Sequence, residues 1–171
     1  MKNFLLTFCL IIFLSLMSHA SDAQSVPAPV VASKMIPITY MVPADKEQYT
    51  KIVHSFMDIG MAESQKQAKA LPFIKKTVEV AVSTDVMRAS AEAAAHEFGN
   101  YGKPENKRIL YLKVKGKTAY VLLDIDRDGW AGVSYTIGLI HPLVEKTLLQ
   151  FKNIEQVVFD EAPGEPRLYD R

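Results

Sequence analysis

Residues 107–160, KRILYLKVKGKTAYVLLDIDRDGWAGVSYTIGLIHPLVEKTLLQFKNIEQVVFD, decide the fold of this chain. They contain two runs rich in apolar and β-branched residues, Arg108 to Lys115 and Lys117 to Asp126, with Gly116 between them. Alternate positions in each run are apolar, which is the pattern of a strand with one buried face. The residues expected to face the core are Leu110, Leu112, Val114, Ala119, Val121, Leu123 and Ile125. Two such runs joined at a glycine predict an antiparallel hairpin.

The remainder of this stretch predicts a helix and then a strand. Leu139 to Phe151 has apolar residues at helical spacing. Pro142 fits either the first turn of this helix or a kink inside a longer helix that starts near Ser134. Gln156 to Phe159 is short and apolar, and it predicts the last strand.

The segment before residue 72 predicts a strand and one or two helices. Met35 to Val42 is β-branched and apolar, and Pro37 places this strand at a sheet edge. Asp45 to Gly60 has one apolar face and a glycine at its end, which predicts a helix. The residues of that face are Tyr49, Ile52, Val53, Phe56 and Met57. Residues 61–70 predict either a weak second helix or a surface excursion.

Residues 73–98 predict a second strand and helix. Phe73 to Val82 alternates between apolar and polar residues, as a half-buried strand does. Asp85 can cap a helix from Val86 to Phe98. The resulting order of elements, β-α-β-α-β-β-α-β, predicts the α/β class. We expect a small two-layer sandwich, in which two to three helices cover one face of a mixed sheet of about five strands.

The N-terminus predicts export. Lys2 precedes the apolar run Phe4 to Met17, and small residues follow at Ser18 to Ala23, which is the layout of a cleavable signal peptide. An uncleaved anchor is the alternative, but the run is shorter than a membrane span needs. The predicted divisions are a signal peptide at 1–23, a flexible leader at 24–34, a single domain at 35–162 and a loose tail at 163–171. We therefore expect a periplasmic or secreted protein without a membrane anchor after cleavage.

Charge and cysteine content exclude several classes of function. The chain has 20 basic and 19 acidic residues, so it lacks the strong positive field that draws proteins to nucleic acid. Its single cysteine, Cys9, lies inside the apolar run. Cleavage of the signal peptide would leave no thiol, which excludes disulfides, thiolate metal sites and a cysteine nucleophile.

Three segments of the chain resemble a known family. They are the strand KTAYVLLD at 117–124, the helix end EKTLLQF at 145–151 and the strand IEQVVF at 154–159. In this order the chain resembles the sporulation and spore-germination domain called GerMN. The resemblance covers Ile36 to Glu165, which spans nearly all of the GerMN-like domain predicted at 35–162, and it is close over the last part of that range. It implies an exported, non-catalytic domain that takes part in cell-wall or envelope assembly. The implied partners are an envelope protein or a cell-wall polymer.

One acidic loop has the spacing of a cation site. Asp124, Asp126 and Asp128 occupy positions 1, 3 and 5 of a calcium-type loop, and Gly129 occupies position 6. Position 12 is Tyr135, which cannot supply the bidentate carboxylate, so we expect a weak calcium site at best. The alternative is a strand that ends in solvent with aspartates and a turn. Asp124, Asp126 and Asp128 are the metal-ligating candidates, and no other cofactor is indicated.

Other candidate residues point to binding rather than catalysis. Trp130 is the only tryptophan, and it is either a partner contact or a lid over the core. His96-Glu97 begins a zinc-protease pattern, but Asn100 stands where the second histidine should be. We find no catalytic motif and expect a non-enzymatic binding domain. A calcium-stabilised secreted binding domain is the second hypothesis, and a hydrolase assembled from dispersed residues is the third.

Overall fold

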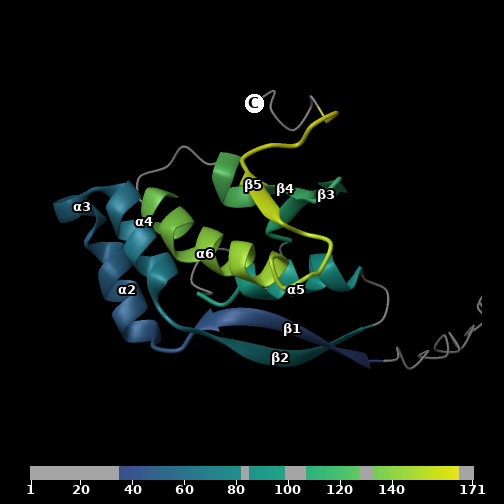
Figure 1. Ribbon diagram of the computed structural model, residues 1–171, viewed down its shortest axis with the longest axis horizontal. Helices are drawn as coiled ribbons and strands as arrows, with labels where there is room; N and C mark the ends of the chain where they lie inside the picture. The colour runs from purple at the N-terminus through teal and green to yellow at the C-terminus, as the bar shows by residue number, and fades with distance from the viewer. Residues whose placement is uncertain (1–34, 82–84, 99–106, 128–132, 166–171) are drawn as a thin grey trace, which may run out of the picture. The chain divides into compact units, whose positions relative to one another are not determined.

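The computed structural model describes residues 35–81, 85–98, 107–127 and 133–165, and its strands form two sheets (Figure 1). In the first sheet β1 (Met35–Pro43) pairs antiparallel with β2 (Phe73–Ala81). The second sheet has the order β3-β4-β5, with β3 (Ile109–Lys115), β4 (Thr118–Leu123) and β5 (Gln156–Phe159). In it, β4 is antiparallel to β3 and parallel to β5.

Helices pack against both sheets. They are α2 (Lys46–His54), α3 (Phe56–Ile59), α4 (Met61–Ala70), α5 (Val86–Ala95) and α6 (Val133–Leu148), and the short 3-10 helix η1 (Asp124–Arg127) follows β4. Figure 1 shows α5 and α6 between the β1-β2 ribbon and the three-stranded sheet. The predicted α/β class, with five strands, is confirmed.

The expectation of one continuous sheet is wrong, and the outer edge of β1 gives the reason. The Met41 backbone N–H donates to Thr147 Oγ1 of α6 at 2.9 Å, so it points away from β2. The main-chain N–H and C=O groups of successive residues in a strand point to opposite edges. The N–H and C=O groups of all odd-numbered residues of β1 therefore point to this outer edge. Pro37 and Pro43 are among them and have no N–H to donate. A helix side chain and two prolines therefore replace the neighbouring strand that one sheet would require.

The predicted hairpin is confirmed, with one correction to its core face. Gly116 has a φ of 60° in the turn between β3 and β4. The pairing register shifts between Ile109 and Tyr111, so Ile109 joins the core in the place expected for Leu110. The remaining residues predicted to face the core all contact it: Leu112, Val114, Ala119, Val121, Leu123 and Ile125.

The helix predicted over residues 45–60 is interrupted. It breaks at Ser55, whose hydroxyl donates to the Ile52 carbonyl at 2.7 Å, and α3 then runs to Gly60 with a φ of 83°. Such back-bonding by serine competes with the regular helix. Met57, expected on the buried face, is 79% exposed as a result. Residues 61–70 form α4, so the helical alternative for this segment holds.

Pro142 lies inside α6, as the longer of the two predicted helices requires. Because proline has no N–H, the carbonyl four residues earlier, at Gly138, loses its helical partner. Tyr49 of α2 supplies the missing donor, since its hydroxyl lies 3.1 Å from the Gly138 carbonyl oxygen and 3.1 Å from that of Leu139. Tyr49 is fully buried, and this burial raises the pKa of its hydroxyl.

We expect Tyr49→Phe to lower the free energy of unfolding by about 1–3 kcal/mol, because it leaves the Gly138 carbonyl buried without a donor. Urea unfolding at neutral pH measures the change. Tyr120→Phe is the matched control, since the Tyr120 hydroxyl makes no hydrogen bond among the described residues. Equal losses in the two variants would contradict this role of Tyr49.

Candidate functional site

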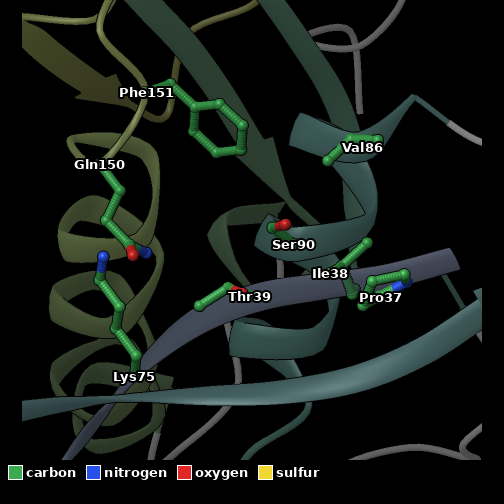
Figure 2. A pocket seen from close by; sticks show the side chains of 8 residues that line it. All are labelled: Pro37, Ile38, Thr39, Lys75, Val86, Ser90, Gln150 and Phe151. Atoms are coloured by element: carbon green, nitrogen blue, oxygen red, sulfur yellow. The ribbon is translucent and has the colours of Figure 1, made fainter.

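A pocket of about 290 Å³ lies beside the outer edge of β1 (Figure 2). Its lining residues come from β1, β2, α5 and the turn that follows α6. They are Pro37, Ile38, Thr39, Lys75, Val86, Ser90, Gln150 and Phe151. Figure 2 shows Gln150 and Phe151 on one side, Val86 and Ile38 on the other, and Ser90 between them. The pocket combines apolar walls with a few polar groups, which is the usual make-up of a binding site.

The main chain of Thr39 faces this pocket. Met41, two residues further on, has its N–H directed at Thr147, and Pro37, two residues earlier, has none. Thr39 is also odd-numbered, so its N–H and C=O point to the same edge, away from β2. An edge with unpaired main-chain groups is a template on which another chain can pair.

Ser90 contributes a buried hydroxyl that lacks a partner. The residue is 1% exposed, and its Oγ makes no hydrogen bond among the described residues. It lies on α5, where a serine could instead bond the carbonyl one turn back. Leaving a buried hydroxyl unsatisfied costs about 1–3 kcal/mol, so native structures rarely do it without reason.

Lys75 gives the pocket a single formal charge. Among the described residues Lys75 forms no salt bridge, whereas its neighbour Lys76 pairs with Glu97 at 3.0 Å. None of the described residues that line the pocket is a carboxylate. Gln150 is the other polar side chain, and its amide donates weakly, at 3.3 Å, to the Thr147 carbonyl. The pocket is therefore positive and rich in donors.

Two of the predicted cation ligands lie at the carboxyl end of the parallel β4-β5 pair. This is the end of a parallel sheet where ligands commonly bind. Asp124 begins η1, and its Oδ1 accepts a hydrogen bond from the Ile125 N–H at 2.8 Å. Asp126 uses both of its oxygens: Oδ2 accepts from the Leu123 N–H at 2.9 Å, and Oδ1 lies 2.7 Å from His141 Nε2.

The Asp126–His141 pair was not anticipated from the sequence, in which His141 stands alone. The Asp126 side chain is 1% exposed, and the His141 ring stacks on Phe159 with 4.0 Å between the ring centroids. The pair therefore joins η1, α6 and β5. Only the fold reveals it, because the partners are 15 residues apart on different elements.

Two further charged residues lie at the same end. Asp160 follows β5 with a φ of 63°, and burial and then the nearby Asp126 raise the pKa of its carboxyl group. Arg108, whose carbonyl accepts from the Asp124 N–H at 2.8 Å, is buried. Its Nε and Nη1 have no partner among the described residues.

The remaining predictions from the sequence concern residues that lie partly outside the described ranges. Asp128, Gly129 and Trp130 lie outside the described residues, so the complete calcium loop and the partner contact at Trp130 stay predictions. Within the described ranges no cluster of three metal-ligating side chains is present. At the start of the tail expected to be loose, the Pro163 carbonyl accepts from the Tyr111 hydroxyl at 3.1 Å.

His96 and Glu97, considered for zinc, take part in two separate ionic contacts. His96 Nε2 lies 3.1 Å from Glu92 Oε1 within α5. Glu97 is 3% exposed and binds three donors: the Tyr40 hydroxyl at 2.8 Å, Lys76 at 3.0 Å and Lys46. This Glu97 cluster connects the end of α5 to β1, β2 and α2.

Comparison with known proteins yields no match: no family model, no curated protein and no solved structure is similar to this chain. The part of the chain that the structure describes contains no helix both long and apolar enough to cross a membrane. Sequence reasoning missed Ser90, Lys75 and Gln150, and its only signal for the pocket was Pro37, which marks an edge strand.

Proposed function

We propose that this chain is an exported, non-catalytic α/β domain that binds an extended segment of a cell-envelope or cell-wall associated protein. The binding element is the first half of the outer edge of β1, Met35 to Thr39, where a short segment would pair with the main chain on either side of Pro37, before Thr147 occupies the edge at Met41. In this mode main-chain hydrogen bonds supply affinity and neighbouring pockets supply specificity. The observation that carries the proposal is the outward-facing main chain of Thr39, which pairs with no strand among the described residues and lies beside a pocket of about 290 Å³.

Export and an envelope partner rest on the sequence. The N-terminal apolar run supports secretion or a periplasmic location. The resemblance to the GerMN domain supports a role in envelope or cell-wall assembly through contacts with other proteins. A calcium-stabilised binding domain is less well supported, because Asp126 already uses both carboxylate oxygens within the protein.

The Thr39 N–H gives a direct test of strand addition. Thr39→Pro removes this N–H, and Pro37 shows that β1 accepts proline at a residue facing the same edge. We expect short random peptides selected on the wild-type protein to lose at least about fivefold in affinity for Thr39→Pro, because about 1 kcal/mol or more of hydrogen bonding is removed. Isothermal titration of the selected peptides measures the loss.

Thr39→Ala is the matched control, since it changes the side chain and keeps the N–H. It should bind the selected peptides as the wild type does. Circular dichroism and thermal unfolding must show that Thr39→Pro is folded. Failure to select any peptide, or equal binding by folded Thr39→Pro, would rule out strand addition at β1.

A further inference from the structure

We infer that the segment bound along β1 ends in the pocket with its carboxyl terminus, and that Lys75 and Ser90 hold the terminal carboxylate. This inference rests on the proposed function. It names the chemistry of the partner: a protein chain with a free C-terminal carboxylate and a small or medium apolar last residue. The sequence indicated neither residue, because they lie on different elements, β2 and α5, that only the fold brings to one pocket.

The charge of the pocket selects an anion. Among the described residues of the lining, Lys75 brings the only formal charge, and none of them is a carboxylate that could neutralise it. Other lysines of the domain have a carboxylate partner: Lys46 and Lys76 share Glu97, and Lys69 pairs with Glu145 at 2.6 Å. A hydrogen bond between a lysine and a carboxylate is roughly twice as strong as one between neutral groups.

The unpaired hydroxyl of Ser90 favours a ligand that can accept a hydrogen bond. Its Oγ is buried, makes no hydrogen bond among the described residues, and lies between Phe151 and Val86 in Figure 2. A carboxylate oxygen placed in the pocket would accept from this hydroxyl while its partner oxygen accepts from Lys75. Binding would thus satisfy the group that the unbound protein leaves unpaired.

The fold also explains why a chain end, rather than a continuous strand, fits here. At Met41 the outer edge of β1 is occupied by Thr147, and Gln150 and Phe151 follow at the end of α6. A segment paired with Met35 to Thr39 therefore meets α6 and cannot continue along β1. A volume of about 290 Å³ is at the lower end for a small-molecule site, which suits the last residue or two of a chain.

The apolar walls of the pocket favour an apolar side chain on the last residue of the bound segment. Ile38, Val86 and Phe151 line the pocket around Ser90. A terminal residue with an apolar side chain would bury it against these walls, while its carboxylate lies toward Lys75. An aspartate or glutamate side chain would offer the same carboxylate, but it would leave the main chain running on into α6.

The test uses two random peptide libraries, one displayed with free carboxyl termini and one with the same segments inside a loop. We expect enrichment from the first library only. Synthetic peptides from that library, ending in a carboxylate, should bind at least about tenfold more tightly than the same peptides ending in an amide. Lys75→Gln should remove this difference, whereas Lys113→Gln, an exposed lysine on β3, should keep it.

Ser90→Ala is an independent test, because it should lower peptide affinity and raise the stability of the unbound protein. It should weaken binding of the carboxylate peptides several-fold. The same change should raise the midpoint of thermal unfolding of the unbound protein by several degrees, because it removes an unsatisfied buried hydroxyl. A Ser90→Ala variant with unchanged peptide affinity would overturn the role of Ser90.

The outcomes separate the inference from the proposed function. Two results would contradict recognition of a terminal carboxylate but support strand addition at β1. One is equal enrichment from both libraries. The other is equal affinity of the amide and carboxylate peptides, together with loss of binding in Thr39→Pro. No enrichment from either library would overturn both.

Discussion

Replacing Glu97 with alanine is expected to lower the free energy of unfolding by about 3 kcal/mol. The Glu97 side chain is 3% exposed and lies against two lysines and a tyrosine hydroxyl. Truncation leaves the Tyr40 hydroxyl and two ammonium groups without their shared acceptor. Lys46 and Lys76 are 51% and 46% exposed, so they regain part of their hydration, and the loss stays at the low end for a buried ionic cluster.

The Glu97 cluster also acts through packing. Lys46 lies over the Phe98 ring, with its amine 5.7 Å from the centroid, and Lys76 lies over the Tyr40 ring at the same distance. Both lysines are therefore positioned by an aromatic face as well as by the carboxylate. Urea unfolding measures the total effect. Glu79→Ala, at an exposed glutamate of β2, is the control and should change stability by less than about 0.5 kcal/mol.

The contribution of Glu97 should depend on pH. Burial favours a higher pKa for its carboxyl group, but hydrogen bonds from Lys46, Lys76 and Tyr40 outweigh it and lower the pKa below the ordinary value of 4.5. Because the folded-state pKa is lowered, the stabilisation is complete above pH 4.5 and is lost as the pH falls through the folded-state value. The stability difference between wild type and Glu97→Gln should therefore shrink in acid. A difference that persists unchanged well below pH 4.5 would contradict this account.

Replacing Asp126 with alanine is expected to lower the free energy of unfolding by about 2–3 kcal/mol. The change leaves the Leu123 N–H, in a fully buried residue, without its acceptor. It also removes the 2.7 Å contact that holds His141 against Phe159. Both losses occur where η1, α6 and β5 meet, so they affect one contiguous region.

This substitution also distinguishes the structural role of the acidic loop from the predicted calcium site. If Asp126 is structural, Asp126→Ala lowers the unfolding midpoint equally in millimolar calcium and in chelator, and calcium leaves the wild type unchanged. If the loop binds calcium, the wild type gains several degrees with calcium, and Asp124→Ala and Asp126→Ala abolish that gain. Glu161→Ala, at an exposed carboxylate near Asp160, is the control for a general charge effect.

Local pattern predicted most of the elements, and it failed where one residue changed the backbone. The hairpin at Gly116, the strand at Met35 and the helix capped by Asp85 were predictable, because alternation, helical spacing and capping act over a few residues. The break at Ser55 and the register shift beside Ile109 were not. Each of these depends on a local hydrogen bond or bulge that periodicity alone does not show.

The candidate site was hardly predictable. Ser90 and Lys75 are unremarkable in the sequence, the one in an alanine-rich helix and the other in an alternating strand. They can be identified as site residues only in the fold, where α5 and β2 place them in one pocket with Thr39 and the turn after α6. The acidic loop had the stronger sequence signal for a site. In the fold, however, the Asp126 carboxylate contacts His141 and accepts from the Leu123 N–H.

The sequence by itself determined the α/β class, the order of the strands and helices along the chain, and the absence of any cysteine beyond the first apolar run. These follow from periodicity, composition and turn residues, which are local properties. Only the tertiary structure decided that the strands divide into two sheets, that Tyr49 completes the hydrogen bonding around Pro142, and that Ser90 faces a positive pocket. Such contacts join residues far apart in the chain, and their partners are chosen by packing, which no local pattern encodes.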